Sequence, residues 1–179
     1  IVSALGWILL AVSAGLLLAA AKTGHADFMF RFNPIGAMHA HAHLGALGFF
    51  VMMLVGVSYK LVPMFTLGEI KNHRRALASV ILLDLGLAGA FVSILRQNAW
   101  KPVFALAVIA AFAIYGWEMA AILRARKRRA LDWGLTYFLT ALALLAPLSI
   151  LALVLSWTKL PLNTFTGQLE NAYGFVGIV

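Results

Sequence analysis

Long apolar runs separated by short polar segments dominate this sequence. Five of the runs reach the roughly 20 residues that an α-helix needs to cross a bilayer. They occupy residues 1–21, 37–64, 76–95, 102–123 and 133–157. A sixth run begins near residue 171 and continues to the last residue, Val179. The pattern predicts an all-α fold, a polytopic transmembrane helix bundle of five helices plus the start of a sixth, in a single domain over residues 1–179.

Both ends of the sequence fall inside apolar runs. The chain begins at Ile1, without a methionine, and stops at Val179 soon after the sixth run opens. The first run lacks the preceding basic region and the cleavage site of a signal peptide, so we interpret it as a membrane-spanning helix. We expect the sequence to be part of a longer protein, incomplete at both ends.

The composition agrees with residence in lipid. Hydrophobic residues make up 63% of the chain and charged residues 11%, whereas a soluble domain is about half apolar and about a quarter charged. These proportions exclude a soluble enzyme, a disordered chain and a nucleic-acid-binding module, and they make the lipid bilayer the first partner. The chain has no cysteine, which excludes disulfides and thiolate metal sites.

The net charge of +8 comes from basic residues that lie between the apolar runs. Nine of them flank the segments after the second and fourth helices: Lys60, Lys71, Arg74, Arg75, Arg124, Arg126, Lys127, Arg128 and Arg129. The other three connections hold Lys22, Arg31, Arg96, Lys101 and Lys159. The positive-inside rule places the richer segments in the cytoplasm, so the second helix runs from outside to inside. We expect a bacterial cytoplasmic (inner) membrane, and we interpret the run at 124–129 as a topology signal rather than a site for anionic lipid.

Four of the five histidines, His25, His39, His41 and His43, lie in or before the outer end of the second helix. A histidine in a lipid-embedded helix costs free energy unless it is paired, hydrated or ligated. On an α-helix His39 and His43 share a face, whereas His41 points roughly 200° away from His39. His43 lies deepest and is the first candidate ligand for haem iron, copper or zinc. The alternative is that these histidines bond to water and loop carbonyls at the interface.

The same helix carries His41-Ala42-His43, Gly48-Phe49, Gly56, Tyr59 and Leu61-Val62-Pro63 in that order. This stretch resembles helix two of the haem–copper oxidase subunit I superfamily, most closely the large subunit of nitric oxide reductase and the NnrS-type haem- and copper-containing membrane proteins. The resemblance implies a b-type haem near the outer face, held axially by His43 or else by His41, in an electron-transfer or gas-binding oxidoreductase.

The family's second axial histidine and its copper-ligating histidines lie on later helices, and the runs at 76–95, 102–123 and 133–157 contain no histidine. Either a missing part of the protein supplies those ligands, or the fold persists without the full redox centre. Arg31, near the histidines, is a candidate partner for a haem propionate or simply an exposed loop arginine.

Two further functions stay open. The chain could be a non-catalytic accessory subunit of a larger respiratory or photosynthetic complex, with other membrane subunits as partners and an unidentified electron donor. It could also hold copper or zinc through His25, His39 and His43, with His41 facing another helix. Whether the chain is an enzyme is left open by the residues alone.

Two carboxylates, Asp84 and Glu118, lie inside predicted helices near the cytoplasmic boundary. We interpret them as separate structural groups rather than as a proton path or a carboxylate pair. Glu118 is expected to reach a basic side chain such as Arg124. For Asp84 the expected partner is a hydroxyl, from Ser58, Ser79 or Tyr59.

Overall fold

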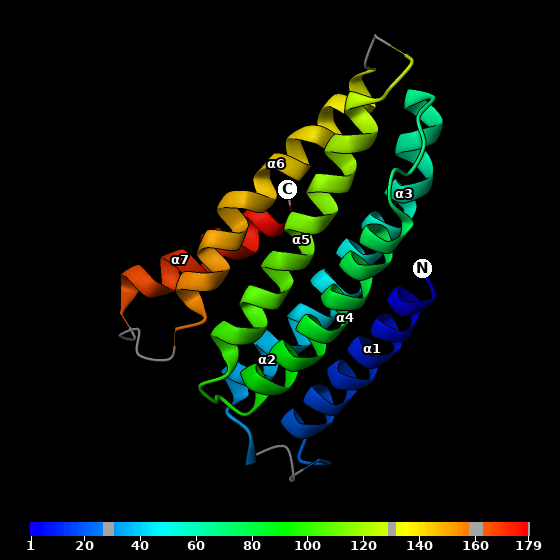
Figure 1. The fold of residues 1–179 in the computed structure, drawn as a ribbon. Coiled ribbons are helices and arrows are strands. Elements are labelled where there is room, and N and C mark those ends of the chain that lie inside the picture. The colour runs from blue at the N-terminus through cyan, green and yellow to red at the C-terminus, as the bar shows by residue number, and fades with distance from the viewer. Residues whose placement is uncertain (27–30, 129–131, 158–162, 179) are drawn as a thin grey trace.

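The computed structural model describes residues 1–26, 31–128, 132–157 and 163–178, which form helices and no strands (Figure 1). Five helical runs are long and apolar enough to cross a membrane. They are α1 (Val2–Lys22), the run Pro34–Thr66, α4 (His73–Leu95), α5 (Lys101–Arg124) and α6 (Trp133–Leu155). A shorter helix, α7 (Thr164–Ile178), follows. The predicted all-α bundle of five spanning helices and the start of a sixth is therefore confirmed.

The helices run up and down along a common direction (Figure 1). Helix α3 ends and α4 begins at one end of the bundle, where α5 also ends and α6 begins. The connection from α4 to α5 lies at the opposite end, with the end of α1 and the start of α2. Helices α4 and α5 form the most extensive pair. The core lies between them and the second run, and its fully buried side chains include Met52, Leu83, Leu87, Met119 and Ile122.

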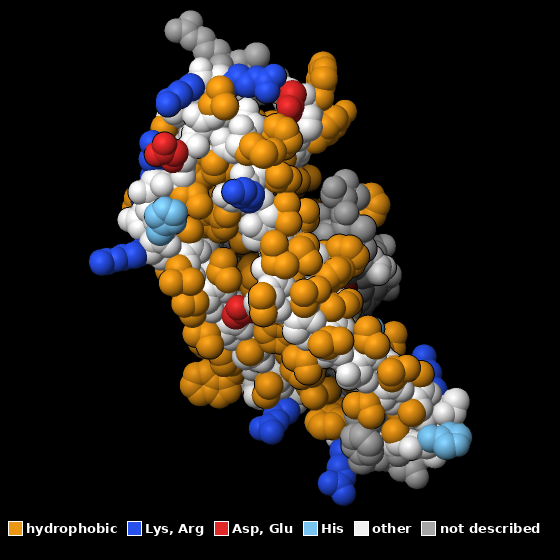
Figure 2. All heavy atoms as spheres, turned by 90° about the vertical axis from the view of Figure 1, so that its right-hand side faces the viewer, with side chains coloured by type: hydrophobic (Ala, Val, Ile, Leu, Met, Phe, Trp, Pro, Cys, Tyr) orange, Lys and Arg blue, Asp and Glu red, His pale blue; other side chains and the backbone are white. Residues whose placement is uncertain are grey.

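Figure 2 shows one face of the molecule, on which hydrophobic side chains cover most of the length while lysines and arginines gather toward the two ends. Apolar side chains such as Leu9, Leu16, Leu85 and Ile150 are more than 45% exposed. In water such a surface would be unstable, because soluble monomers rarely expose large apolar patches. The surface fits a protein whose outer faces contact lipid.

An asparagine or aspartate directly precedes four of the helices. The side chains of Asn33, Asn72, Asp132 and Asn163 each accept a hydrogen bond from the backbone N–H three residues later, at 3.0, 3.1, 2.7 and 2.9 Å. Such N-caps satisfy backbone donors that a helix end leaves without partners.

The Asn163 cap corrects the predicted start of the sixth helix. We expected that helix near residue 171, whereas α7 begins at Thr164, seven residues earlier. The apolar run alone misplaced the start, because the first turns of α7 carry polar residues on their exposed side, Gln168 and Glu170. The cap at Asn163 was the signal that would have placed it.

The second spanning run contains three elements in series: α2 (Pro34–His43), the π-helix η2 (Leu44–Val51) and α3 (Met52–Thr66). A π-helix is wider than an α-helix, because each N–H bonds to the carbonyl five residues back, and it is often found at functional sites. The change of winding starts directly after His43. His39, His41 and His43 all lie within α2, so the faces expected for them from α-helical geometry still apply.

Candidate functional site

His43 is the last residue of α2, and both nitrogens of its ring have a partner. Nδ1 lies 2.7 Å from the carbonyl oxygen of His39, and Nε2 lies 3.3 Å from the hydroxyl oxygen of Tyr173 on α7. A carbonyl only accepts hydrogen bonds, so Nδ1 carries the proton, and the Tyr173 hydroxyl donates to Nε2. The two rings also stack, with centroids 5.9 Å apart and planes 24° apart.

This arrangement gives His43 the tautomer of a metal ligand. Metal-ligating histidines almost always donate their other ring N–H to a carbonyl, a carboxylate or water, which fixes the ring and leaves the second nitrogen to bind. Here Nε2 is that second nitrogen, and Tyr173 occupies its lone pair through a long hydrogen bond. An iron or copper ion would therefore replace Tyr173 at Nε2.

Tyr173 is a partner of His43 that the sequence did not predict. It lies 130 residues from His43 in the chain, and nothing in the periodicity of the last helix indicates which helix it packs against. His39 contacts His43 through its backbone carbonyl, while the His39 side chain is half-buried.

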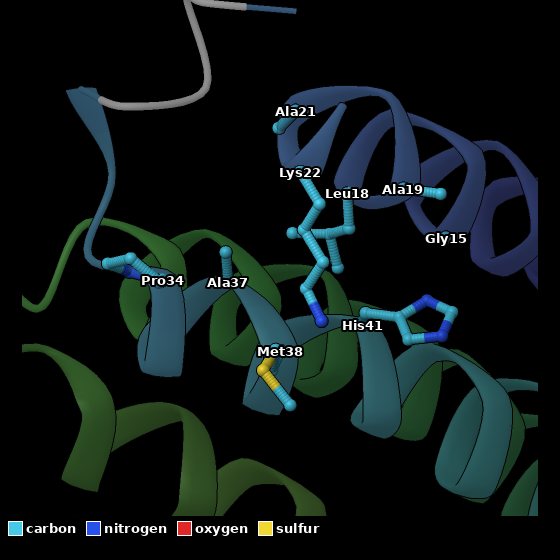
Figure 3. Close-up of a pocket in the computed structure, with 9 residues that line it drawn as sticks. All are labelled: Gly15, Leu18, Ala19, Ala21, Lys22, Pro34, Ala37, Met38 and His41. Atoms are coloured by element: carbon cyan, nitrogen blue, oxygen red, sulfur yellow. The ribbon is translucent and has the colours of Figure 1, made fainter. Parts of the chain in front are cut away.

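His41 faces a different neighbour, as its position on the helix predicted. Its ring lies against α1 at Gly15, where an added Cβ would be only 3.0 Å from His41 Cε1. Its Nδ1 is buried and has no hydrogen-bond partner among the described residues. The ring also borders a cleft of about 440 Å³ between α1 and α2, which Figure 3 shows in close-up.

The two remaining candidates lie at the periphery. His25 is exposed beyond the end of α1, with Nδ1 3.1 Å from the Thr23 hydroxyl oxygen. Arg31 is exposed, three residues before α2 begins. Within the described part of the chain, no three His, Asp or Glu side chains are grouped so that they could hold a metal ion. A copper or zinc site from His25, His39 and His43 stays a prediction without a converging ligand set.

Asp84 bonds to α1, not to the hydroxyls we expected. Its Oδ1 accepts hydrogen bonds from the Ser3 hydroxyl and from Trp7 Nε1, the latter at 2.7 Å. The expected partners bond elsewhere: Ser58 to Tyr115 at 2.6 Å, and Tyr59 to Ser79 at 2.8 Å. The prediction of a hydroxyl partner is confirmed, because Ser3 supplies one, but the three residues named for it were wrong. Spacing along one helix does not show which neighbouring helix it faces.

Glu118 is fully buried and has three partners. Its Oε1 accepts hydrogen bonds from the backbone N–H groups of Lys71 and Asn72 at 2.6 and 2.8 Å, and its Oε2 lies 2.9 Å from Arg75 Nη2. The Arg75 guanidinium in turn lies 4.9 Å from the centre of the Trp117 ring. The expected basic partner is present, although it is Arg75 and not Arg124. Asp84 and Glu118 thus bond to separate partner groups, as interpreted from the sequence.

A comparison of the chain with protein-family models, with curated proteins and with solved structures finds no match in any of the three. The resemblance of the second helix to the haem–copper oxidases therefore stays a prediction that rests on its own residues.

Proposed function

We propose that this chain is an integral membrane subunit that binds a b-type haem through His43, in a redox or gas-binding role of the haem–copper oxidase type. The observation that supports the proposal is the hydrogen bond from His43 Nδ1 to the His39 carbonyl, which leaves Nε2 as the ligating nitrogen. We further propose that the histidines lie at the outer face of a bacterial inner membrane, as the distribution of basic residues indicates.

The donor chemistry around His43 fits haem. A neutral imidazole is the usual protein ligand of b-type haem iron, and a carbonyl already orients this one. Bound there, haem would supply one-electron transfer or a binding site for a diatomic gas. The chain's own part is to fix the His43 ring through His39, to release Nε2 from Tyr173, and to offer Arg31 to a propionate.

An absorption spectrum of the purified chain tests this proposal. We expect a Soret band in the wild type when iron and haem precursors are supplied, its loss in His43→Ala, and its retention in His25→Ala, which changes an exposed histidine outside α2. Gel-filtration profiles of all three proteins check that the bundle stays assembled. A wild-type protein without a Soret band under these conditions contradicts the proposal. Loss in His41→Ala with retention in His43→Ala would assign the ligand to His41.

One observation favours a second candidate, a non-catalytic subunit of a larger membrane complex. In the present arrangement Tyr173 and the His39 carbonyl satisfy both nitrogens of His43 without a metal. On this view His43 is a structural link between α2 and α7. Haem quantified in the isolated complex separates the two candidates, because one haem per chain excludes the structural role and its absence excludes the redox role.

A further inference from the structure

The cleft between α1 and α2 is independent of the His43 site. It has a volume of about 440 Å³, within the range of roughly 300–1,000 Å³ that is common for ligand pockets. The described residues that line it are apolar except for two, Lys22 at the end of α1 and His41 on α2. The rim residues Ala19 and Met38 are exposed on the outside of the bundle. The cleft therefore opens toward the surroundings of two membrane-spanning helices.

The two polar side chains of the cleft come from opposite walls. Figure 3 shows the Lys22 side chain extending from α1 toward α2, where Met38 and His41 leave the helix. Among the described residues, Lys22 forms no salt bridge and no carboxylate lines the cleft. The His41 ring has a buried nitrogen without a hydrogen-bond partner among those residues. Burial without a hydrogen-bond partner is unfavourable for a polar atom.

The charge and the lining together specify the ligand. A cationic amine requires an anion, whereas the remaining walls, including Leu18, Ala19 and Met38, suit a hydrocarbon chain. Lys22 lies at one end of α1, at the depth where a lysine reaches the head-group region. The molecule that brings an anionic group and an alkyl chain together at this depth of a bilayer is an anionic phospholipid.

We propose that this cleft binds one anionic phospholipid, with its phosphate at Lys22, its glycerol ester groups on the His41 side of that phosphate, and an acyl chain along the α1–α2 groove. The site is distinct from the proposed haem site, because His41 and His43 face different helices. Gly15 is part of the site, since a Cβ there would lie 3.0 Å from His41 Cε1, so that the His41 ring would have to shift.

Native mass spectrometry of the full chain in detergent, titrated with phosphatidylglycerol or phosphatidylcholine, tests the proposal. We expect one phosphatidylglycerol to bind about tenfold more tightly than phosphatidylcholine, and Lys22→Gln to remove the difference. Lys101→Gln is the matched control. Lys101 begins α5 at the same end of the bundle, and its Nζ bonds to Gln97 Oε1 at 2.6 Å, outside the cleft. We expect it to leave the preference unchanged.

Equal affinity of the wild type for the two lipids overturns the proposal. So does an equal loss in Lys101→Gln and Lys22→Gln, which would show only a general attraction of anionic lipid to basic residues. Ala19→Phe fills the cleft from its exposed rim without changing charge, and we expect it to weaken phosphatidylglycerol binding as Lys22→Gln does. Tight phosphatidylglycerol binding in Ala19→Phe would place the lipid elsewhere and also overturn the proposal.

Discussion

Glu118 shows at the scale of one residue how a buried charge can organise this bundle. The side chain projects from α5 into the start of α4, where two backbone N–H groups and Arg75 surround it. Backbone N–H groups before a helix favour a negative charge, because the helix dipole is positive there. The carboxylate thus fixes the connection between α3 and α4 against α5.

We expect Glu118→Gln to lower the stability of the protein by about 1–3 kcal/mol, because the change leaves Arg75 without its counter-charge and weakens two charge-assisted hydrogen bonds. Thermal denaturation in detergent, followed by circular dichroism, measures the effect. Glu69→Gln is the control, since Glu69 is exposed in the same connection, and it should change stability by less than about 0.5 kcal/mol. Equal shifts in the two variants would contradict the role assigned to Glu118.

For a single charged residue inside a helix, the sequence predicts that a partner is needed but does not identify which residue it is. A carboxylate in an apolar helix must be paired, so a basic residue near Glu118 and a hydrogen-bond donor near Asp84 could be expected. Arg75, Ser3 and Trp7 could not be chosen in advance, because each comes from another helix or its connection. The contact of His43 with Tyr173 was beyond prediction for the same reason.

At the scale of elements, Gly48 lets η2 approach α1 and α4 closely. A Cβ added at Gly48 would lie 2.8 Å from Trp7 Cβ on α1 and 2.9 Å from Leu87 Cδ2 on α4. Trp7 is also the donor to Asp84. The small residue, the indole and the carboxylate therefore belong to one junction between α1, η2 and α4.

We expect Gly48→Ala to destabilise the protein by about 1–3 kcal/mol, because overpacking at this junction displaces Trp7. Gly45 supplies the matched control in the same π-helix, since a Cβ there meets nothing within 4 Å. Gly45→Ala should be neutral or stabilising by up to about 1 kcal/mol. Thermal midpoints of both variants in one detergent decide the matter, and a Gly45→Ala loss as large as that of Gly48→Ala would refute the packing account.

The spans were predictable because lipid imposes a length and an apolar composition on each helix, while their ends depended on local chemistry. The run predicted at 37–64 corresponds to Pro34–Thr66, and its start is set by Asn33, which caps α2. The π-helical winding of η2 has no counterpart in the hydrophobic pattern. Gly48, within η2, packs against Trp7 of α1 and Leu87 of α4, and the pattern of a single helix does not show such contacts.

At the scale of the whole molecule, the basic residues divide unequally between the two ends of the bundle. The connections that follow α3 and α5 carry most of the basic residues. They also contact each other, because the backbone N–H groups of Lys127 and Arg128 donate to the Thr66 carbonyl at 3.2 and 3.3 Å. The two basic connections therefore meet at this end of the bundle. The positive-inside rule predicts that it faces the cytoplasm, with the histidines and the lipid cleft at the other end.

Accessibility of single cysteines tests this orientation, because the chain has no cysteine of its own. Ala99 and Ala125 are both exposed, and they lie just outside the two ends of α5. In intact cells a membrane-impermeant maleimide should label Ala99→Cys and leave Ala125→Cys unlabelled, whereas both should react after the cells are lysed. The reverse pattern in intact cells would place the basic end outside. It would also place the His43 site and the lipid cleft in the cytoplasmic leaflet. The distribution of basic residues would then no longer support a haem at the outer face, although the geometry of both sites would be unchanged.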